Sequence, residues 1–161
     1  MFDTNVGQDV FTKLQRALEK YKGWERVEVE EYDVYYGENN LRTTVYPDGT
    51  QNSIIKKSLE KIDYVTDRLP LDVRMGISKE SPVDVPDEME YTASKHKVRT
   101  SYYRKNLRID MTAVTGDPDD KDAEEAEEFQ VELEIVNLKL VKSMQDFYSH
   151  VYKIKNLLDC L

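Results

Sequence analysis

The chain has 161 residues, 39% of them apolar and 34% charged, which suits a single domain over residues 1–161 with a modest core. Its formal net charge is −9, no run approaches the ~18 apolar residues of a membrane helix, and the first residues lack the pattern of a secretory signal. The composition therefore predicts neither a membrane protein nor an exported one. A single cysteine, Cys160, and two histidines argue against disulfides and zinc, so any metal is expected to be magnesium or manganese on carboxylates.

The predicted elements run from a helix through strands to a second helix. Apolar residues recur at helical spacing over 8–22, where Gly23 is expected to end the helix. Alternating patterns rich in Val, Thr and Tyr predict strands at 27–36, 41–46, 54–62, 71–80, 95–103, 107–114 and 129–137. A final helix is expected over 138–158. Because no helical pattern separates the strands, the sequence favours an α+β fold, with an antiparallel sheet or barrel flanked by a helix at each end.

Charge is separated along the chain. Residues 117–128 hold eight acidic residues and one lysine, and we expect a solvated hairpin loop there because like charges repel. Residues 92–112 hold six lysines or arginines and one acidic residue. An anionic ligand would therefore meet a basic region in spite of the negative total.

Alternation places charged side chains on one face of each later strand and apolar side chains on the other. The charged faces carry Arg74 and Glu80, then Lys95, Lys97 and Arg99, then Arg108, Asp110 and Thr112, and finally Gln130, Glu132 and Glu134. An ordinary sheet with its polar side in water is enough to explain the alternation. A basic strand beside an acidic one also suits a closed barrel with a charged lumen, in which a phosphate chain and a divalent metal would balance the charges.

Four segments in this order resemble one family. They are Leu71-Asp72-Val73-Arg74 leading to Ser78-Lys79-Glu80, then Lys95-His96-Lys97-Val98-Arg99, Arg108-Ile109-Asp110-Met111-Thr112, and Gln130-Val131-Glu132-Leu133-Glu134. Together they resemble the mRNA-capping RNA 5′-triphosphatases of the beta-subunit type, from fungi, protists and large DNA viruses, within the triphosphate tunnel metalloenzymes. The resemblance runs from about residue 11 to residue 158. It implies an eight-stranded antiparallel tunnel that removes the terminal phosphate of nascent RNA with magnesium or manganese.

The resemblance also implies a role for individual residues. Phosphate contacts fall on Arg42, Lys56, Arg74, Lys95, Lys97, Arg99 and Arg108, with Lys57 as the alternative to Lys56. Catalytic roles fall on Glu80, Arg99, Arg108, Asp110, Glu132 and Glu134. Of these, Glu132 and Glu134 are the expected metal ligands, and Glu80 is expected to orient the attacking water or support the site.

The sequence departs from the family pattern in two places. Gln130 replaces the first glutamate of a Glu-x-Glu-x-Glu strand, and the family's opening strand, which carries two metal-binding glutamates, has no counterpart before the helix at 8–22. The acidic segment 28–31 follows that helix, so we interpret it as an exterior or edge strand. We therefore expect about seven of the eight strands, an open sheet edge, and a chain that aggregates or forms a homodimer.

The first functional hypothesis is a metal-dependent RNA 5′-triphosphatase that acts on triphosphate-ended RNA, with mRNA guanylyltransferase as a candidate partner. It would work in the nucleus, or in a cytoplasmic viral factory if a virus encodes it. The alternatives are a non-catalytic module that binds polyphosphate or RNA ends, and a tripolyphosphatase of the same superfamily. His96 falls on the apolar face by alternation and is expected to be structural, and Trp24 is expected to be a packing anchor.

Overall fold

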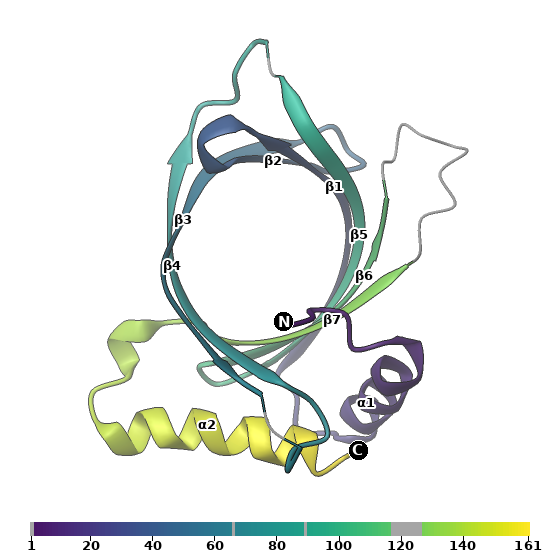
Figure 1. The fold of residues 1–161 in the computed structure, drawn as a ribbon, viewed down its shortest axis with the longest axis vertical. Coiled ribbons are helices and arrows are strands. Elements are labelled where there is room, and N and C mark those ends of the chain that lie inside the picture. Colours follow the sequence, from purple (N-terminus) through teal and green to yellow (C-terminus); the bar gives the residue numbers. More distant parts are fainter. Residues whose placement is uncertain (1, 66, 89, 117–126) are drawn as a thin grey trace.

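Seven antiparallel strands form one sheet that curls around a central axis (Figure 1). The computed structural model describes residues 2–65, 67–88, 90–116 and 127–161. The strands are β1 (Arg26–Gly37), β2 (Leu41–Val45), β3 (Gln51–Tyr64), β4 (Val73–Val83), β5 (Tyr91–Arg104), β6 (Leu107–Thr115) and β7 (Glu128–Ile135). Helix α1 (Gln8–Lys20) precedes them and helix α2 (Met144–Leu158) follows, with short 3₁₀ turns η1 (Glu38–Asn40) and η2 (Leu138–Leu140). The predicted α+β fold with a helix at each end is confirmed.

The strand order leaves two edges in the described part of the chain. The order is β4-β3-β2-β1-β5-β6-β7, and every neighbouring pair is antiparallel. Six antiparallel steps separate β4 from β7, so these two edge strands run parallel to each other. One further strand between them, antiparallel to both, would close an all-antiparallel barrel. The predicted seven strands and open edge are confirmed.

The interpretation of residues 28–31 as an exterior or edge strand is wrong. These residues belong to β1, which lies in the middle of the sheet and pairs with β5 along its length and with β2 near its end. Glu30 faces the central cavity described below. The segment was misread because the inner face of this sheet is polar, so its alternation cannot be told from that of a solvent-exposed strand.

The apolar core lies between α1 and the outer face of β5, β6 and β7. Phe11, Leu14 and Leu18 recur at helical spacing and pack against Tyr102, Leu107, Ile109, Met111 and Phe129. Helix α1 ends at Lys20 rather than at residue 22, because Tyr21 is already extended. Trp24 is the expected packing anchor: its indole N–H donates to the Leu18 carbonyl at 2.8 Å, and its ring lies 5.4 Å from that of Tyr102.

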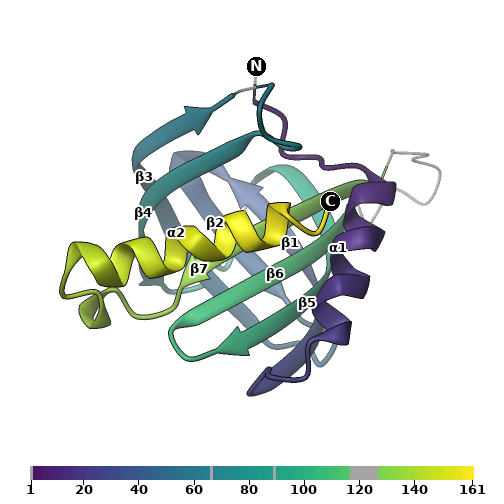
Figure 2. The same cartoon turned by 90° about the horizontal axis from the view of Figure 1, so that it is seen from below.

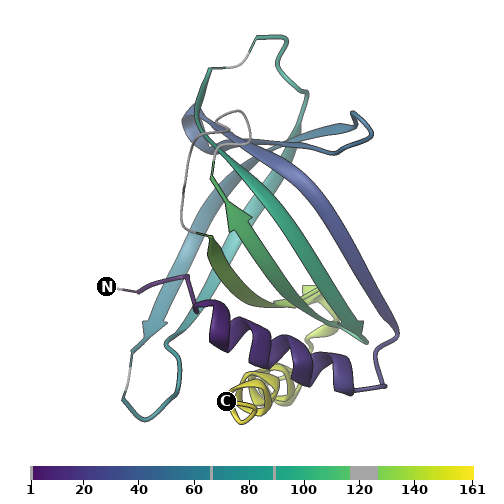
Figure 3. The ribbon, with the colours of Figure 1, turned by 90° about the vertical axis from the view of Figure 1, so that its right-hand side faces the viewer.

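Helix α2 begins at Met144, not at residue 138 as predicted. The Ser143 hydroxyl accepts from the Asp146 N–H at 3.1 Å, and the Asp146 carboxylate accepts from the Ser143 N–H at 3.0 Å. This reciprocal capping box fixes the start of the helix, and Leu138–Leu140 form the separate turn η2. Figure 2 shows α2 on the side of the barrel where β4 and β7 lie, and Figure 3 shows both helices below the barrel.

The remaining differences concern strand ends. β3, β4 and β5 extend beyond their predicted bounds because polar hairpin arms, such as Asp63 opposite Arg74, continue the backbone pairing. The acidic loop expected at 117–128 falls largely on residues 117–126, which lie outside the described residues. No helix in the described ranges is long and apolar enough to cross a membrane.

Candidate active site

The inner face of the sheet surrounds a charged cavity of about 1090 Å³. Alternation sends the apolar residues of β6 outward to the core and its charged residues inward, and the neighbouring strands follow in register. Six cationic side chains and six carboxylates line the cavity: Arg42, Lys56, Arg74, Lys97, Arg99 and Arg108, with Glu30, Glu60, Glu80, Asp110, Glu132 and Glu134. The six positive and six negative formal charges of these side chains sum to zero. The side chains come from all seven strands, β1 to β7.

All but one of the site residues predicted from the sequence line this cavity. The exception is Lys95, which shares the inward face of β5 with Lys97 by alternation, opposite Val34, but does not line the cavity. Between the two lysines proposed for β3, Lys56 lines the cavity and Lys57 is exposed on the other face. The structure therefore brings together most of the predicted residues, while their chemical roles remain predictions.

Arg108 and Asp110 form the most connected group in the cavity wall. The Asp110 side chain is 2% exposed and accepts from the Ser101 hydroxyl at 2.7 Å and from Arg108 Nε at 3.0 Å. Arg108 also pairs with Glu134. Burial alone would lower the pKa of Arg108, but the carboxylates of Asp110 and Glu134 outweigh it and the net shift is upward. The guanidinium is thus held charged and fixed in orientation.

Two other predicted residues are tied to neighbours. Lys56 pairs with Glu80 at 2.8 Å, across adjacent positions of β3 and β4. Arg74 forms two hydrogen bonds to Asp63, at 2.6 and 2.8 Å, and its guanidinium lies 4.2 Å from the Phe2 ring centroid. The hydrogen bond from the Arg74 side chain is the largest contribution to the lowered pKa of Asp63. Arg74 would have to leave this pair to bind a phosphate.

Among the residues of the cavity wall that the sequence did not predict are Glu30, Tyr32 and Glu60. Glu30 was assigned to the exterior with its strand. Tyr32 alternates with Glu30 along β1, so the two share one face and were misplaced together. Glu60 lies four residues after Lys56 along β3, so the same alternation would have placed both on the inward face.

The residues present provide part of a metal site. Glu132 and Glu134 project from one strand into the cavity, and their carboxylates are oxygen ligands of the kind that magnesium and manganese bind. Glu132 has no ion pair or hydrogen bond among the described residues, whereas Glu134 is paired with Arg108. No three Asp, Glu, His or Cys side chains in the described part of the chain cluster so as to hold a metal ion. Glu132 and Glu134 thus provide the oxygen ligands that such a metal binds, but two carboxylates are too few to hold it.

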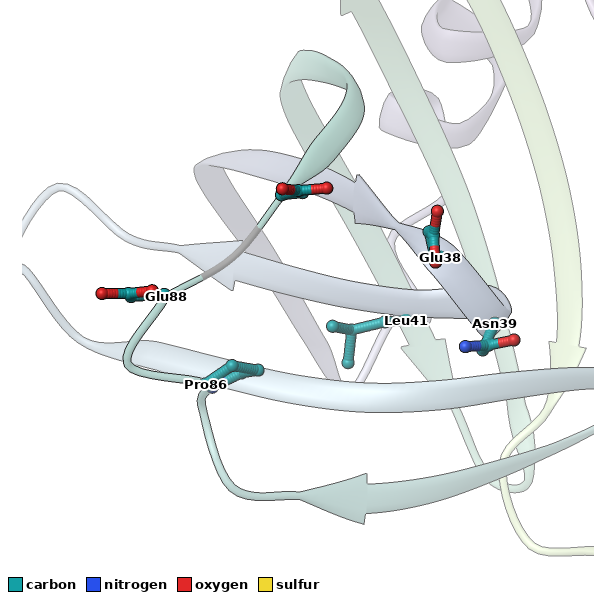
Figure 4. Close-up of a pocket in the computed structure, with 6 residues that line it drawn as sticks. Glu38, Asn39, Leu41, Pro86 and Glu88 are labelled. Carbon is teal, nitrogen blue, oxygen red and sulfur yellow. The ribbon is translucent and has the colours of Figure 1, made fainter.

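A second, smaller pocket lies away from the lumen (Figure 4). It measures about 230 Å³ and is lined by Glu38, Asn39, Leu41, Pro86, Glu88 and Glu90. Three of these six residues are acidic and none is basic. This pocket would repel a phosphate, so the candidate site for an anion is the lumen.

His96 lies outside the cavity, as expected for a structural histidine. Its Nδ1 is 2.7 Å from the Asp33 carboxylate and its Nε2 is 3.1 Å from Glu31. Both acidic partners come from β1, so the contact links the outer faces of β1 and β5.

An antiparallel sheet curled around a lumen of arginines, lysines and carboxylates is characteristic of the triphosphate tunnel proteins. The sequence pattern of the family described as mRNA capping enzyme, beta chain, matches residues 2–158. The chain belongs to this family, which comprises the RNA 5′-triphosphatases of mRNA capping.

Solved structures show the same fold. The chain is similar to S. pombe Pct1 RNA triphosphatase, with a TM-score of 0.82 and 16% identity over 98% of this chain and 71% of that chain. It is also similar to the same protein in complex with the Spt5 CTD, with a TM-score of 0.84 and 17% identity over 98% of this chain and 70% of that one. Comparison with curated protein sequences gives no match.

Proposed function

We propose that this chain removes the γ-phosphate from triphosphate-ended RNA with Mg²⁺ or Mn²⁺, at the lumen of the barrel. The observation that carries this proposal is that Lys97, Arg99 and Arg108 line the same cavity as Glu132 and Glu134. The first three suit the oxygens of a phosphate chain, and the last two suit a divalent cation. Phosphoryl transfer needs little beyond such positioning and charge stabilisation.

The arginines are proposed to stabilise the charge that develops on the departing phosphate. Arg108 is held by Asp110 and Glu134, so its guanidinium does not have to be ordered when substrate binds. Arg99 lies near the same aspartate, with its Nε 3.9 Å from the Asp110 carboxylate, which is beyond hydrogen-bond distance. It is therefore less constrained and can turn toward a ligand.

Asp110 is proposed to act through these arginines and not on the substrate. Its carboxylate is 2% exposed and already accepts hydrogen bonds from Ser101 and Arg108. It is thus a positioning residue. Glu80 is paired with Lys56, which supports the expected role of holding the site in shape or orienting a water.

Glu132 and Glu134 are the residues proposed to hold the metal, which when bound would neutralise charge on the phosphate oxygens. Two carboxylates leave much of the oxygen shell of such an ion unfilled. We propose that a further acidic strand between β4 and β7 completes it, since these two edge strands run parallel and one strand antiparallel to both could pair with each.

The test is phosphate release from triphosphate-ended RNA, with magnesium, with manganese and with chelator. We expect metal-dependent release, and Arg108→Ala should lower kcat at least ~100-fold because a fixed cation in the lumen is lost. Lys57→Ala is the matched control, since Lys57 is exposed on the other face of β3. Equal release in chelator, or full activity of Arg108→Ala, would contradict the proposal.

A second function is favoured by one observation, namely that no three metal-ligating side chains cluster in the described residues. On this reading the chain binds RNA ends or polyphosphate without hydrolysing them. It predicts tripolyphosphate binding in chelator and no turnover with either metal. Faster turnover of free tripolyphosphate than of RNA would instead indicate a tripolyphosphatase.

The remaining proposals concern the setting of the reaction. We propose that the protein acts on nascent RNA in the nucleus, or in a cytoplasmic viral factory if a virus encodes it, next to an mRNA guanylyltransferase that takes the diphosphate end. We propose self-association as a homodimer, supported by the sheet edges at β4 and β7, although Val6 N–H and the Asn5 side chain already bond to Phe129 at one point of the β7 edge. Sedimentation of the isolated chain across a concentration series tests this last point.

A further inference from the structure

Buried polar atoms without a partner gather at one point of the inner face. Tyr32 Oη, Arg99 Nε and Thr112 Oγ1 are buried and have no hydrogen-bond partner among the described residues. Arg99 lies opposite Thr112 between β5 and β6, and its Cζ is 5.3 Å from the Tyr32 ring centroid. Tyr32 is 6% exposed and Thr112 is 1% exposed. Such atoms are rare in folded proteins, and three on neighbouring strands call for a group that supplies their hydrogen bonds.

The chemistry of these atoms specifies the ligand. Arg99 Nε can only donate a hydrogen bond. Burial raises the pKa of Tyr32 to about 12, so its hydroxyl stays protonated at physiological pH and also donates. Two donors that lack acceptors, one of them on a cation, fit an anionic oxygen. Tyr32 and Arg99 both line the cavity, so their side chains border the space that a ligand in the lumen would occupy.

We propose that Tyr32 is a phosphate-binding residue whose hydroxyl donates to the oxygen that Arg99 Nε also binds. This inference rests on the proposed function for the identity of the phosphate as part of an RNA end. A neutral donor has an advantage at this point. Glu30, Asp110 and Glu132 all lie within electrostatic reach of the Tyr32 hydroxyl, and a further cation there would pair with them. The tyrosine can bind phosphate without competing for those carboxylates.

The test measures tripolyphosphate binding by calorimetry in chelator, so that neither metal nor turnover is needed. Tyr32→Phe removes only the hydroxyl and should weaken binding by about 10- to 100-fold, the range for a hydrogen bond to a charged group. Tyr46→Phe is the matched control: its ring lies 5.9 Å from that of Tyr32 and lines the same cavity, but its hydroxyl is not among the unpartnered buried atoms. Its affinity should equal that of the wild type.

Thermal unfolding separates binding from a structural role. Without ligand, Tyr32→Phe should be as stable as the wild type or more so, because it removes a buried hydroxyl that has no partner. Arg99→Lys keeps the charge but removes Nε, and should also weaken binding. Combined with Tyr32→Phe, its effect should be less than additive, since both donors serve one oxygen.

Several results would overturn the inference. They are wild-type affinity in Tyr32→Phe, an equal loss in Tyr46→Phe, a lower melting temperature in the unliganded Tyr32→Phe protein, or no tripolyphosphate binding by the wild type. Failure of the proposed function would look different. The wild type would then release no phosphate from RNA, while the loss of tripolyphosphate affinity in Tyr32→Phe would persist.

Discussion

The two helices of this protein lie on the same side of the barrel but are held in different ways. α1 buries Phe11, Leu14 and Leu18 against the outer face of β5 to β7. α2 has an apolar stripe of similar length but no buried residue. The stripe of α1 meets a continuous, paired part of the sheet. That of α2 faces the region where the sheet has its two edges, except at Leu157, which packs against the core beside α1.

The cavity beside α2 accounts for the looser packing of this helix. The cavity extends from the charged lumen to an apolar part lined by Met75 and Ile77 of β4, Leu133 and Ile135 of β7, and Phe147, Val151 and Ile154 of α2. An apolar helix face and two strand edges thus border the same volume. A strand placed there would present one face to the lumen and the other to α2. Packing on the α1 side is complete, and on the α2 side it is open.

The largest expected effect lies on the α1 side. Leu14→Ala should lower the free energy of unfolding by about 2–5 kcal/mol, because Leu14 is 1% exposed and its removal leaves a cavity in close-packed surroundings. The measurement is urea denaturation followed by circular dichroism. Val151→Ala, on the half-buried face of α2, should cost about 1 kcal/mol or less. Equal losses for the two variants would show that the helices do not differ in packing.

The next effect comes from filling the open side. A peptide of roughly eight residues, alternating glutamate with apolar residues, should pair with β4 and β7 and stabilise the protein by about 2.7 kcal/mol at 100 times its Kd. It should also increase manganese affinity, measured by calorimetry, by adding carboxylates beside Glu132 and Glu134.

The control for this experiment is the same peptide with proline at alternate positions, which cannot donate the backbone hydrogen bonds of a strand. It should neither stabilise the protein nor change metal binding. Glu132→Gln and Glu134→Gln should remove the gain in manganese affinity while leaving peptide binding in place. Stabilisation by the proline peptide would mean that the effect does not arise from strand pairing.

The contrast also shows what sequence can predict. α1 was predicted well because a helix stripe against a sheet face follows ordinary periodicity, and only its end differed, at Lys20. For α2 the apolar pattern continued upstream through Leu138 and Leu140, both of which are exposed, and the start was misplaced. The start of α2 is set by a local signal in the sequence, namely Ser143 followed three residues later by Asp146.

Most of the inner face followed from alternation, since Lys97, Arg99, Arg108 and Glu132 share a cavity as predicted. The position of β1 did not follow. In a barrel with a polar lumen the inward face resembles a solvent-exposed one, so alternation gives two faces without saying which is inside. That ambiguity hid both Glu30 and Tyr32. Only the strand order, with β1 at the centre, resolves it.

A smaller effect is expected at the start of α2. Ser143→Ala removes the acceptor for the Asp146 N–H and should cost about 1 kcal/mol, within the range for helix N-caps. The helix has little packing to compensate, so the loss should appear as faster amide exchange confined to α2. Ser143→Thr, which keeps the hydroxyl, should restore protection. Faster exchange of equal size in α1 would show that the helices unfold together and that their difference in packing is not a difference in local stability.

The smallest expected effect is a response to acid that distinguishes the same two helices. The backbone N–H of Lys142 and the Ser143 side chain lower the pKa of Asp146 below its ordinary value. A carboxylate whose pKa is lower in the folded state stabilises that state above its unfolded pKa, near 4, and loses the contribution as pH falls through the folded value. The N-cap residue of α1 is Gly7, which has no side chain to accept a hydrogen bond, so α1 lacks this contribution. Residue-resolved exchange between pH 5 and pH 3 should therefore show α2 losing protection before α1.

Asp146→Asn should make α2 insensitive over this range, because the amide still accepts a hydrogen bond but does not titrate. If wild-type α2 and α1 lose protection at the same pH, the capping box is not what holds α2 in place, and its contacts beside the open edges must be.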